Sequence, residues 1–209
     1  MQKAFFDSEK VLAFFTDKSM GNLGLYSGDK VVALNNRQRL MQEFGIEKIS
    51  WMKQIHSNVV KIATEEGEMM DCDGLITDKK ELALMVLTAD CVGVLFWDER
   101  NQVVAVAHFG REGTFSKIVK KVVTKMENDF GTEPKYLQVS LGPSIQKCCY
   151  EFEGDFLDLP KMIKEQLLES GVAENNIEIS NICTKCNNNY FSYRRNQKTG
   201  RFAGVIMIK

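Results

Sequence analysis

Two histidines and one cysteine occupy the positions from which this sequence could do metal chemistry. His56 and His108 are the only histidines among the 209 residues, so any chemistry that needs an imidazole must use one or both. His56 follows one short β-like run, Cys91 directly follows a second, and His108 ends a third. Two imidazoles and one thiolate that leave a fourth position open are typical ligands of catalytic zinc. The spacing also allows the alternative that both histidines are ordinary core or surface residues and Cys91 is a small buried apolar group.

The other cysteines give a weaker signal. Cys183 and Cys186 form a C-x₂-C pair, which offers two ligands where a structural zinc site takes four. Cys148 and Cys149 could supply the remaining two, although adjacent residues do not easily chelate one tetrahedral ion. A thioredoxin-like redox role needs the pair at a strand-to-helix turn, and the Asn-Asn-Asn-Tyr that follows is a poor helix start. We therefore expect coincidental structural cysteines at these positions, and reduced thiols throughout the chain.

A pair of arginines is the clearest candidate for binding an anion. Arg194 and Arg195 follow Phe-Ser-Tyr, and each guanidinium offers a rigid bidentate fork that suits a phosphate or a carboxylate. The competing interpretation is a solvated hairpin loop ahead of an apolar strand. Two clusters of carboxylates, around Asp73 and Asp98, have the composition of tight turns.

Composition excludes several classes of protein. The chain carries 27 Lys and Arg against 28 Asp and Glu, a formal charge of −1, which argues against a dedicated nucleic-acid binder. No apolar run approaches the roughly 18 residues that a membrane span needs. Asp7 also interrupts the start of the chain where a signal peptide would continue its apolar stretch. We expect a soluble cytoplasmic protein, a monomer or small homo-oligomer, with no membrane or nucleic-acid partner.

Short apolar runs and a few helical patterns supply the framework for these residues. Helical spacing of apolar residues predicts a helix capped by Thr114 and stopped by Gly131, a second near Pro160–Gly171 and a third over Arg37–Phe44. Strands mostly follow each other directly, so we expect an α/β (mixed α+β) fold, a mixed sheet with flanking helices. No Pro/Gly/Ser-rich linker divides the chain, so residues 1–209 are expected to form one domain. The predicted strands are Val11–Phe15, Ile49–Met52, Val59–Ala63, Leu82–Leu87, Val92–Trp97, Val103–His108, Tyr136–Leu141 and Phe202–Ile208.

Six ordered blocks of residues give the chain a more specific signature. They are Gln54-Ile-His-Ser57, Asp73-Gly-Leu-Ile-Thr77, Ala89-Asp-Cys91, His108-Phe-Gly-Arg-Glu-Gly-Thr114, Gly142-Pro-Ser-Ile-Gln-Lys-Cys-Cys-Tyr-Glu151, and Cys183-Thr184 with Phe191-Ser-Tyr-Arg-Arg195 and Thr199-Gly-Arg201. Together these segments resemble the polyphenol oxidoreductase family, also called the laccase-domain or YfiH-like family.

The resemblance implies both a site and a set of activities. It implies a compact α/β fold and a metal site formed by His56, Cys91 and His108, with zinc as the expected ion and copper as the alternative. The family is associated with phosphorolysis of purine nucleosides such as adenosine, inosine and methylthioadenosine, which gives the base and ribose 1-phosphate. It is also associated with adenosine deamination, with copper-dependent oxidation of phenols, and with an amidase-like role on peptidoglycan precursors.

Residue counts and residue types help to weigh these activities. A cluster of several copper ions needs many imidazoles, whereas this chain has two, so copper oxidation would have to use the single His₂Cys site. A zinc-dependent purine nucleoside enzyme fits better, with a nucleoside and phosphate as its small-molecule partners. Asp90 or Asp73 would carry a proton or orient a histidine ligand. The residues expected to bind substrate are Arg37, Gln54, Arg111 and Arg194.

Two alternatives stay open beside that interpretation. The thiolate of Cys91 could act as a nucleophile on an amide, with His108 or His56 as its base. A metal-binding or redox-sensing protein without catalysis is the other alternative.

The sequence departs from the family pattern at two places. The Trp-Arg that follows the second histidine in the family is Arg111-Glu112 here, and we expect Glu112 to repel phosphate and weaken turnover. The N-terminal region also lacks the Gly-Gly-x-Ser stretch that the family carries before its Asn-Arg, which is Asn36-Arg37 in this chain.

Overall fold

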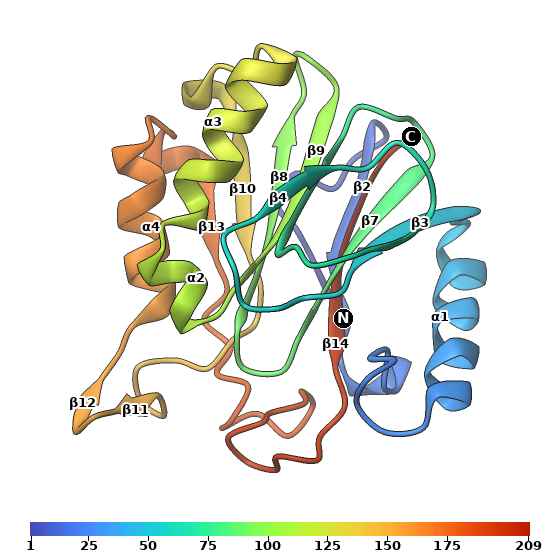
Figure 1. The fold of residues 1–209 in the computed structure, drawn as a ribbon, viewed down its shortest axis with the longest axis vertical. Coiled ribbons are helices and arrows are strands. Elements are labelled where there is room, and N and C mark those ends of the chain that lie inside the picture. Colours follow the sequence, from blue (N-terminus) through green and yellow to red (C-terminus); the bar gives the residue numbers. More distant parts are fainter.

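Two six-stranded mixed sheets lie face to face in the computed structural model, which describes residues 1–209 (Figure 1). The first sheet has the order β1-β2-β14-β7-β3-β5, with bounds Gln2–Lys3, Val11–Phe15, Phe202–Ile208, Leu82–Thr88, Lys48–Met52 and Gly67–Met69. The second has the order β13-β10-β8-β9-β6-β4, with bounds Ile177–Ile179, Gln138–Leu141, Val92–Asp98, Val103–Phe109, Gly74–Thr77 and Val60–Ile62. A separate two-stranded hairpin consists of β11 (Glu151–Phe152) and β12 (Asp155–Phe156).

Helices cover the outer face of each sheet, so the molecule has four layers in the order helix, sheet, sheet, helix (Figure 1). α1 (Lys30–Phe44) packs on the first sheet, and α3 (Ile118–Phe130) and α4 (Leu159–Glu169) pack on the second. The short α2 (Arg111–Phe115) immediately precedes α3. Three 3₁₀ helices complete the structure, at Lys18–Met20, Pro134–Tyr136 and Glu174–Asn176.

Strand residues alternate between the buried space that separates the sheets and the space under the helices. In β7, Leu84 and Val86 face the opposite sheet, whereas Met85 belongs to the cluster under α1. In β8, Leu95 faces the opposite sheet and Phe96 packs with α3 and α4. Because both faces of the central strands are buried, these strands are continuous apolar runs and not alternating ones.

The predicted mixed α/β fold is confirmed, but its strands divide between two sheets where one was expected. Gly74–Thr77 forms β6, a buried strand between β4 and β9, although the preceding Asp73 suggested only a turn. The strand expected at Tyr136 begins at Gln138, because Pro134 starts a 3₁₀ helix there. Sequence inspection also missed β5 and β13, which are three residues long.

The helix expected after Thr114 is two helices. Thr114 lies inside α2, where its buried hydroxyl donates to the carbonyl of Gly110, and it caps nothing. Lys117 has φ 56°, which breaks the helix before Ile118. The apolar spacing begins at Phe115, but that side chain is exposed, and the buried apolar face starts at Ile118. The first helix also starts earlier than predicted, at Lys30, because the side chain of Asp29 caps it.

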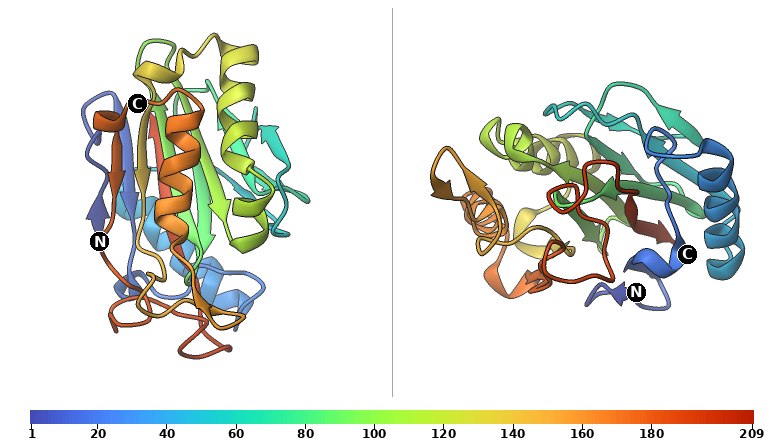
Figure 2. Two further views of the ribbon diagram at one scale, coloured as in Figure 1. Left: turned by 90° about the vertical axis from the view of Figure 1, so that its left-hand side faces the viewer. Right: turned by 90° about the horizontal axis from the view of Figure 1, so that it is seen from below.

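The loops that follow β3, β7, β9 and β10, and the long segment before β14, gather at the lower end of the molecule in Figure 1. Seen from below, these loops lie over the ends of both sheets (Figure 2). This arrangement brings residues far apart in the sequence to one place. No helix in the structure combines the length and the apolar character needed to cross a membrane.

Candidate active site and metal centre

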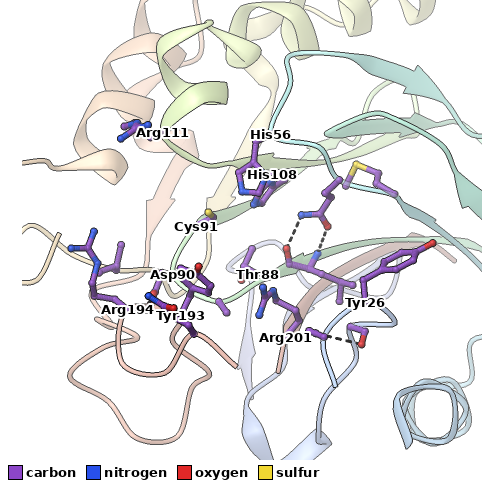
Figure 3. Close-up of a pocket in the computed structure, with 18 of the residues that line it drawn as sticks. Tyr26, His56, Thr88, Asp90, Cys91, His108, Arg111, Tyr193, Arg194 and Arg201 are labelled. Carbon is purple, nitrogen blue, oxygen red and sulfur yellow. Dashed lines mark hydrogen bonds between the residues drawn. The ribbon is translucent and has the colours of Figure 1, made fainter. Parts of the chain in front are cut away.

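A cavity of about 870 Å³ opens at this lower end of the sheets. Its wall comes from the loop after the first 3₁₀ helix, the ends of β3, β7 and β9, the start of α2, and the loops after β10 and before β14. That volume lies within the range of small-molecule sites, and tyrosines and arginines supply much of the wall (Figure 3). The cavity is therefore the place to look for the chemistry that the sequence predicts.

The three expected metal ligands meet on the wall of this cavity. His56, Cys91 and His108 each offer one ligand atom, and these atoms lie within 4.8 Å of one another. The two imidazole rings stand nearly perpendicular, with centroids 4.8 Å apart, and Figure 3 shows the three side chains turned toward a common point. His56 has a φ of 60° in the loop after β3, and Gly110 leaves room for its ring, since a Cβ there would lie 2.8 Å from the His56 Cδ2.

Asp73 holds both histidines of this group in place. Its fully buried carboxylate accepts hydrogen bonds from the backbone amides of Ile55, His56 and Ser57 at 3.2, 3.1 and 2.6 Å. It also accepts one from the Ser57 hydroxyl and lies 2.9 Å from the His108 Nδ1. A carboxylate that holds the Nδ1 proton of an imidazole leaves Nε2 free to bind a metal. Asp73 therefore fixes both the His56 loop and the orientation of His108.

The buried thiol and imidazole perturb each other. Burial alone would raise the pKa of Cys91, but the neighbouring His108 outweighs it and lowers that pKa to about 6. Burial likewise opposes the charged form of His108, yet Cys91 and Asp73 together raise the pKa of His108 to about 9. Hydrogen bonds from His108 and Ser57 hold the pKa of Asp73 below its ordinary value despite burial. Without a metal, the site near neutral pH is a thiolate beside an imidazolium.

The donor set fits a zinc ion. A thiolate and two imidazoles are accepted zinc ligands, and three protein ligands leave a fourth position for water or substrate. The low pKa of Cys91 favours the thiolate form that a metal needs, and Asp73 sets the tautomer of His108. Copper accepts the same donors, so the donor set does not by itself choose between the two ions.

Cationic and polar groups line the cavity near the ends of β7 and β14. The Arg201 guanidinium uses its Nη1 for the carbonyls of Thr199 and Gly200, and no protein hydrogen bond occupies its Nη2 or Nε. Burial lowers the pKa of Arg201, against the attraction of Cys91 and Asp90 across the cavity. Figure 3 shows Arg201 beside Thr88, whose buried hydroxyl has no protein partner. Arg201 belongs to the Thr199-Gly-Arg201 block, but the sequence did not indicate it as a substrate-binding residue.

Arg194 and Asp90 also line the cavity, as the sequence suggested, but both already have protein partners. Arg194 donates to the Glu151 carbonyl at 3.1 and 3.2 Å, and its guanidinium lies 5.4 Å from the centre of the Tyr150 ring. The two oxygens of Asp90 accept from the Thr184 hydroxyl at 2.7 Å and from the Arg194 amide at 2.6 Å. Asp90 contacts neither histidine, so Asp73 is the carboxylate that orients one.

The structure does not bring every candidate ligand to the cavity. Arg37 is buried outside it, where it donates to the Leu23 carbonyl and stacks 4.8 Å from the centre of the Trp51 ring. Arg37 therefore supports the loop at Leu23, whose next residues line the cavity, and does not face the cavity itself. Gln54 lines the cavity, but its amide exchanges two hydrogen bonds with the backbone of Leu87, at 2.8 and 2.9 Å.

The Arg111-Glu112 pair departs from the family pattern in an unexpected way. The two side chains form an ion pair at 2.8 Å, and the Arg111 guanidinium stacks 3.7 Å from the centre of the Phe152 ring. Both residues line the cavity, but Figure 3 shows Arg111 turned away from the three ligands. Glu112 therefore competes with any anion for Arg111 in addition to repelling it.

Four of the remaining cysteines form a second group of candidate ligands. The sulfurs of Cys148, Cys149, Cys183 and Cys186 lie within 4.8 Å of one another, and all six cysteines of the chain are free. The sequence led us to expect coincidental structural cysteines at these positions, whereas the structure brings all four sulfurs together. Arg195, by contrast, does not line the cavity and holds the carbonyls of Thr184 and Lys185.

Comparison with known proteins places the chain among proteins of similar sequence and fold. A family model described as multi-copper polyphenol oxidoreductase laccase matches residues 14–157 and 154–209. The chain is 34% identical to a protein of Clostridium acetobutylicum named purine nucleoside phosphorylase, over 98% of this chain and 94% of that protein. The crystal structure of the hypothetical protein YfiH of Bacillus licheniformis is similar at a TM-score of 0.90 with 26% identity, covering 95% of this chain and 93% of that one. YlmD of Geobacillus stearothermophilus is similar at a TM-score of 0.90 with 27% identity, covering 96% and 93%.

Proposed function

Since the chain belongs to the multi-copper polyphenol oxidoreductase laccase family, we propose that it is a zinc-dependent purine nucleoside phosphorylase that also deaminates adenosine. The name of the Clostridium acetobutylicum relative supports the substrate class. The word copper in the family description does not imply a multicopper centre here, because both histidines of the chain already belong to the one His₂Cys group.

One observation carries the proposal. Arg201 has two unbonded guanidinium nitrogens on the same cavity that holds the metal ligands. Guanidinium forks bind phosphate through paired hydrogen bonds, so Arg201 is the group best placed to hold inorganic phosphate. Arg194 adds positive charge to the wall, although its side chain also holds the loop at Glu151.

Aromatic residues supply the other half of the pocket. Tyr26 and Tyr193 are exposed and line the cavity, so either ring can stack on a purine. Burial, with the nearby charge of Cys91, raises the pKa of Tyr150. Its phenol therefore keeps its proton near neutral pH and can donate a hydrogen bond to the departing base while phosphate attacks C1′ of the ribose. Zinc, when bound, supplies a Lewis acid for an oxygen of the substrate or of the water that deamination at C6 requires.

The test measures phosphate-dependent base release from inosine and adenosine, together with ribose 1-phosphate. We expect Arg201→Met to raise the phosphate KM by about 10- to 100-fold, which corresponds to one lost charged hydrogen bond of ~1.5–3 kcal/mol. Zinc content should stay unchanged, and Arg100→Met is the matched control, because Arg100 pairs with Glu133 away from the cavity. Base release that is independent of phosphate would contradict phosphorolysis, and adenosine that yields no ammonia would contradict deamination.

A second candidate rests on a different observation. Cys91, His108 and Asp73 form a thiolate, imidazole and carboxylate series, which is also the arrangement of a cysteine nucleophile with an oriented base. An amidase of this kind would work without metal, whereas zinc would occupy its nucleophile. A chelator should therefore abolish phosphorolysis but permit hydrolysis of a peptidoglycan-like amide. A His56→Ala variant loses one zinc ligand but keeps Cys91, His108 and Asp73, and its failure to hydrolyse the amide would exclude the amidase.

A further inference from the structure

The four cysteines outside the cavity come from two loops that are far apart in the sequence. Cys148 and Cys149 lie in the loop after β10, and Cys183 and Cys186 lie in the loop after β13. The two loops are joined by a parallel bridge between Ser144 and Cys183. We propose that these four cysteines hold one zinc ion as a structural tetrathiolate site, separate from the His₂Cys group.

The distances between the sulfurs match those around a tetrahedral ion. Four sulfurs at a zinc–sulfur distance of ~2.3 Å stand about 3.8 Å apart from one another. The Sγ atom of Cys149 lies 3.7 Å from that of Cys148 and 3.3 Å from that of Cys186, and the Cys148 and Cys186 sulfurs are 4.0 Å apart. With Cys183 included, every such distance is below 4.8 Å. Adjacent cysteines therefore do contribute two corners of one tetrahedron in this fold.

Backbone contacts hold the two loops together. Cys183 is buried, and it is the residue through which the bridge to Ser144 joins the loops. Backbone hydrogen bonds from Thr184 to Ser144, at 3.0 Å, and from Asn187 to Cys183, at 2.9 Å, fix the same loops. The four sulfurs are thus held together by hydrogen bonds that do not depend on the ion.

Zinc fits these four cysteines better than disulfide bonds among them do. Cys148 and Cys149 are adjacent, and a bridge between neighbouring residues is strained. A bond between Cys149 and Cys186 would leave two thiols unpaired, that of the exposed Cys148 and that of the buried Cys183. A tetrahedral site of four sulfurs is filled by zinc or by iron, and zinc needs no redox partner.

The tetrathiolate site would hold one wall of the cavity in position. The hydroxyl of Thr184, between Cys183 and Cys186, donates to Asp90, and Asp90 also accepts from the amide of Arg194. On the other loop, Tyr150 directly follows Cys149 and lines the cavity. The tetrathiolate site therefore positions residues of the cavity wall without touching a substrate.

Metal content of the purified protein tests the proposal. We expect two zinc ions per chain in the wild type, one in Cys186→Ser, one in Cys91→Ala, and two in the control Cys72→Ala, whose thiol lies in the core outside both groups. Cobalt substituted into Cys91→Ala should give the intense sulfur-to-metal absorption of a tetrahedral thiolate site. The same spectrum should be lost when Cys186→Ser or Cys148→Ser is combined with Cys91→Ala. Both substituted sulfurs are exposed, so these variants avoid disturbing the core.

Three results would overturn the proposal. The first is a zinc content that Cys148→Ser and Cys186→Ser both leave unchanged. The second is an intact mass, measured under anaerobic conditions, that shows disulfides among the four cysteines. The third is iron in place of zinc at the site. None of these results depends on enzyme activity, so the test stands apart from the proposed phosphorolysis.

Discussion

Replacing Asp73 with asparagine tests whether this carboxylate sets the chemistry of the metal centre. Asparagine has nearly the same shape, but one oxygen becomes an NH₂ group that cannot accept a hydrogen bond. If the NH₂ group takes the place of Oδ2, it faces the amides of Ile55 and Ser57, which can only donate. If it takes the place of Oδ1, it faces the amide of His56 and the Nδ1 of His108.

The second orientation opposes fewer donors, and it changes the histidine. One backbone amide loses its acceptor, which costs about 1–3 kcal/mol, and Nδ1 of His108 must then accept a hydrogen bond instead of donating one. The proton moves to Nε2, the nitrogen that would bind the metal. We therefore expect zinc affinity at the His₂Cys group to fall by about 10- to 100-fold, the usual effect of removing the hydrogen-bond partner of a metal-binding histidine. The midpoint of thermal unfolding of the metal-free protein should fall by roughly 2–12 °C.

Competition with a fluorescent zinc chelator measures the affinity, and calorimetry measures the stability. Asp98→Asn is the matched control, because Asp98 is also a buried carboxylate that accepts from backbone amides, those of Arg100 and Asn101, away from the cavity. Its zinc affinity should equal that of the wild type. Wild-type zinc affinity in Asp73→Asn would refute the role given to this residue, whatever happens to stability.

Three further predictions follow from the same geometry. Since the pKa of His108 is raised to about 9 and that of Cys91 lowered to about 6, zinc affinity should weaken as pH falls from 9 toward 6 and more steeply below 6. Zinc should displace about one proton from His108 near neutral pH and progressively less above pH 9. Titration calorimetry in buffers of different ionisation enthalpy, with the signal of Cys91→Ala subtracted, measures this number, and a value near zero at pH 8 would contradict the imidazolium. Gly110→Ala should lower zinc affinity by ~10-fold, because the new Cβ would lie 2.8 Å from the His56 ring. Helix α2 should stay intact, since the φ of −80° at this position suits alanine. Unchanged affinity would show that the His56 ring is free to move. Arg111→Trp combined with Glu112→Arg should lower the phosphate KM at constant zinc content, because it removes the carboxylate and places at position 112 a guanidinium that this carboxylate no longer pairs with. If phosphorolysis is lost instead, Arg111 is itself the phosphate ligand.

Much of the fold was accessible from the sequence because the central strands are buried on both faces. Runs such as Val92–Trp97 and Val103–Ala107 contain no polar side chain, which marks them as strands from the sequence alone. The same runs carry no information on which neighbour each strand has. The division into two sheets therefore emerged only from the structure, as did the break at Lys117 between α2 and α3.

For the site, the sequence by itself indicated three candidate metal ligands, and the tertiary structure decided which residues support them. Two histidines in 209 residues, each at a strand end, left few ways to build a His₂Cys group, and the structure brings those residues together. Asp73, Arg201 and the four clustered cysteines could not be assigned in the same way. A turn aspartate, a loop arginine and a C-x₂-C pair look alike in any sequence, because their partners lie on other loops. Composition and spacing record what each residue can do, whereas the packing of the two sheets fixes which loops meet and hence what each residue does.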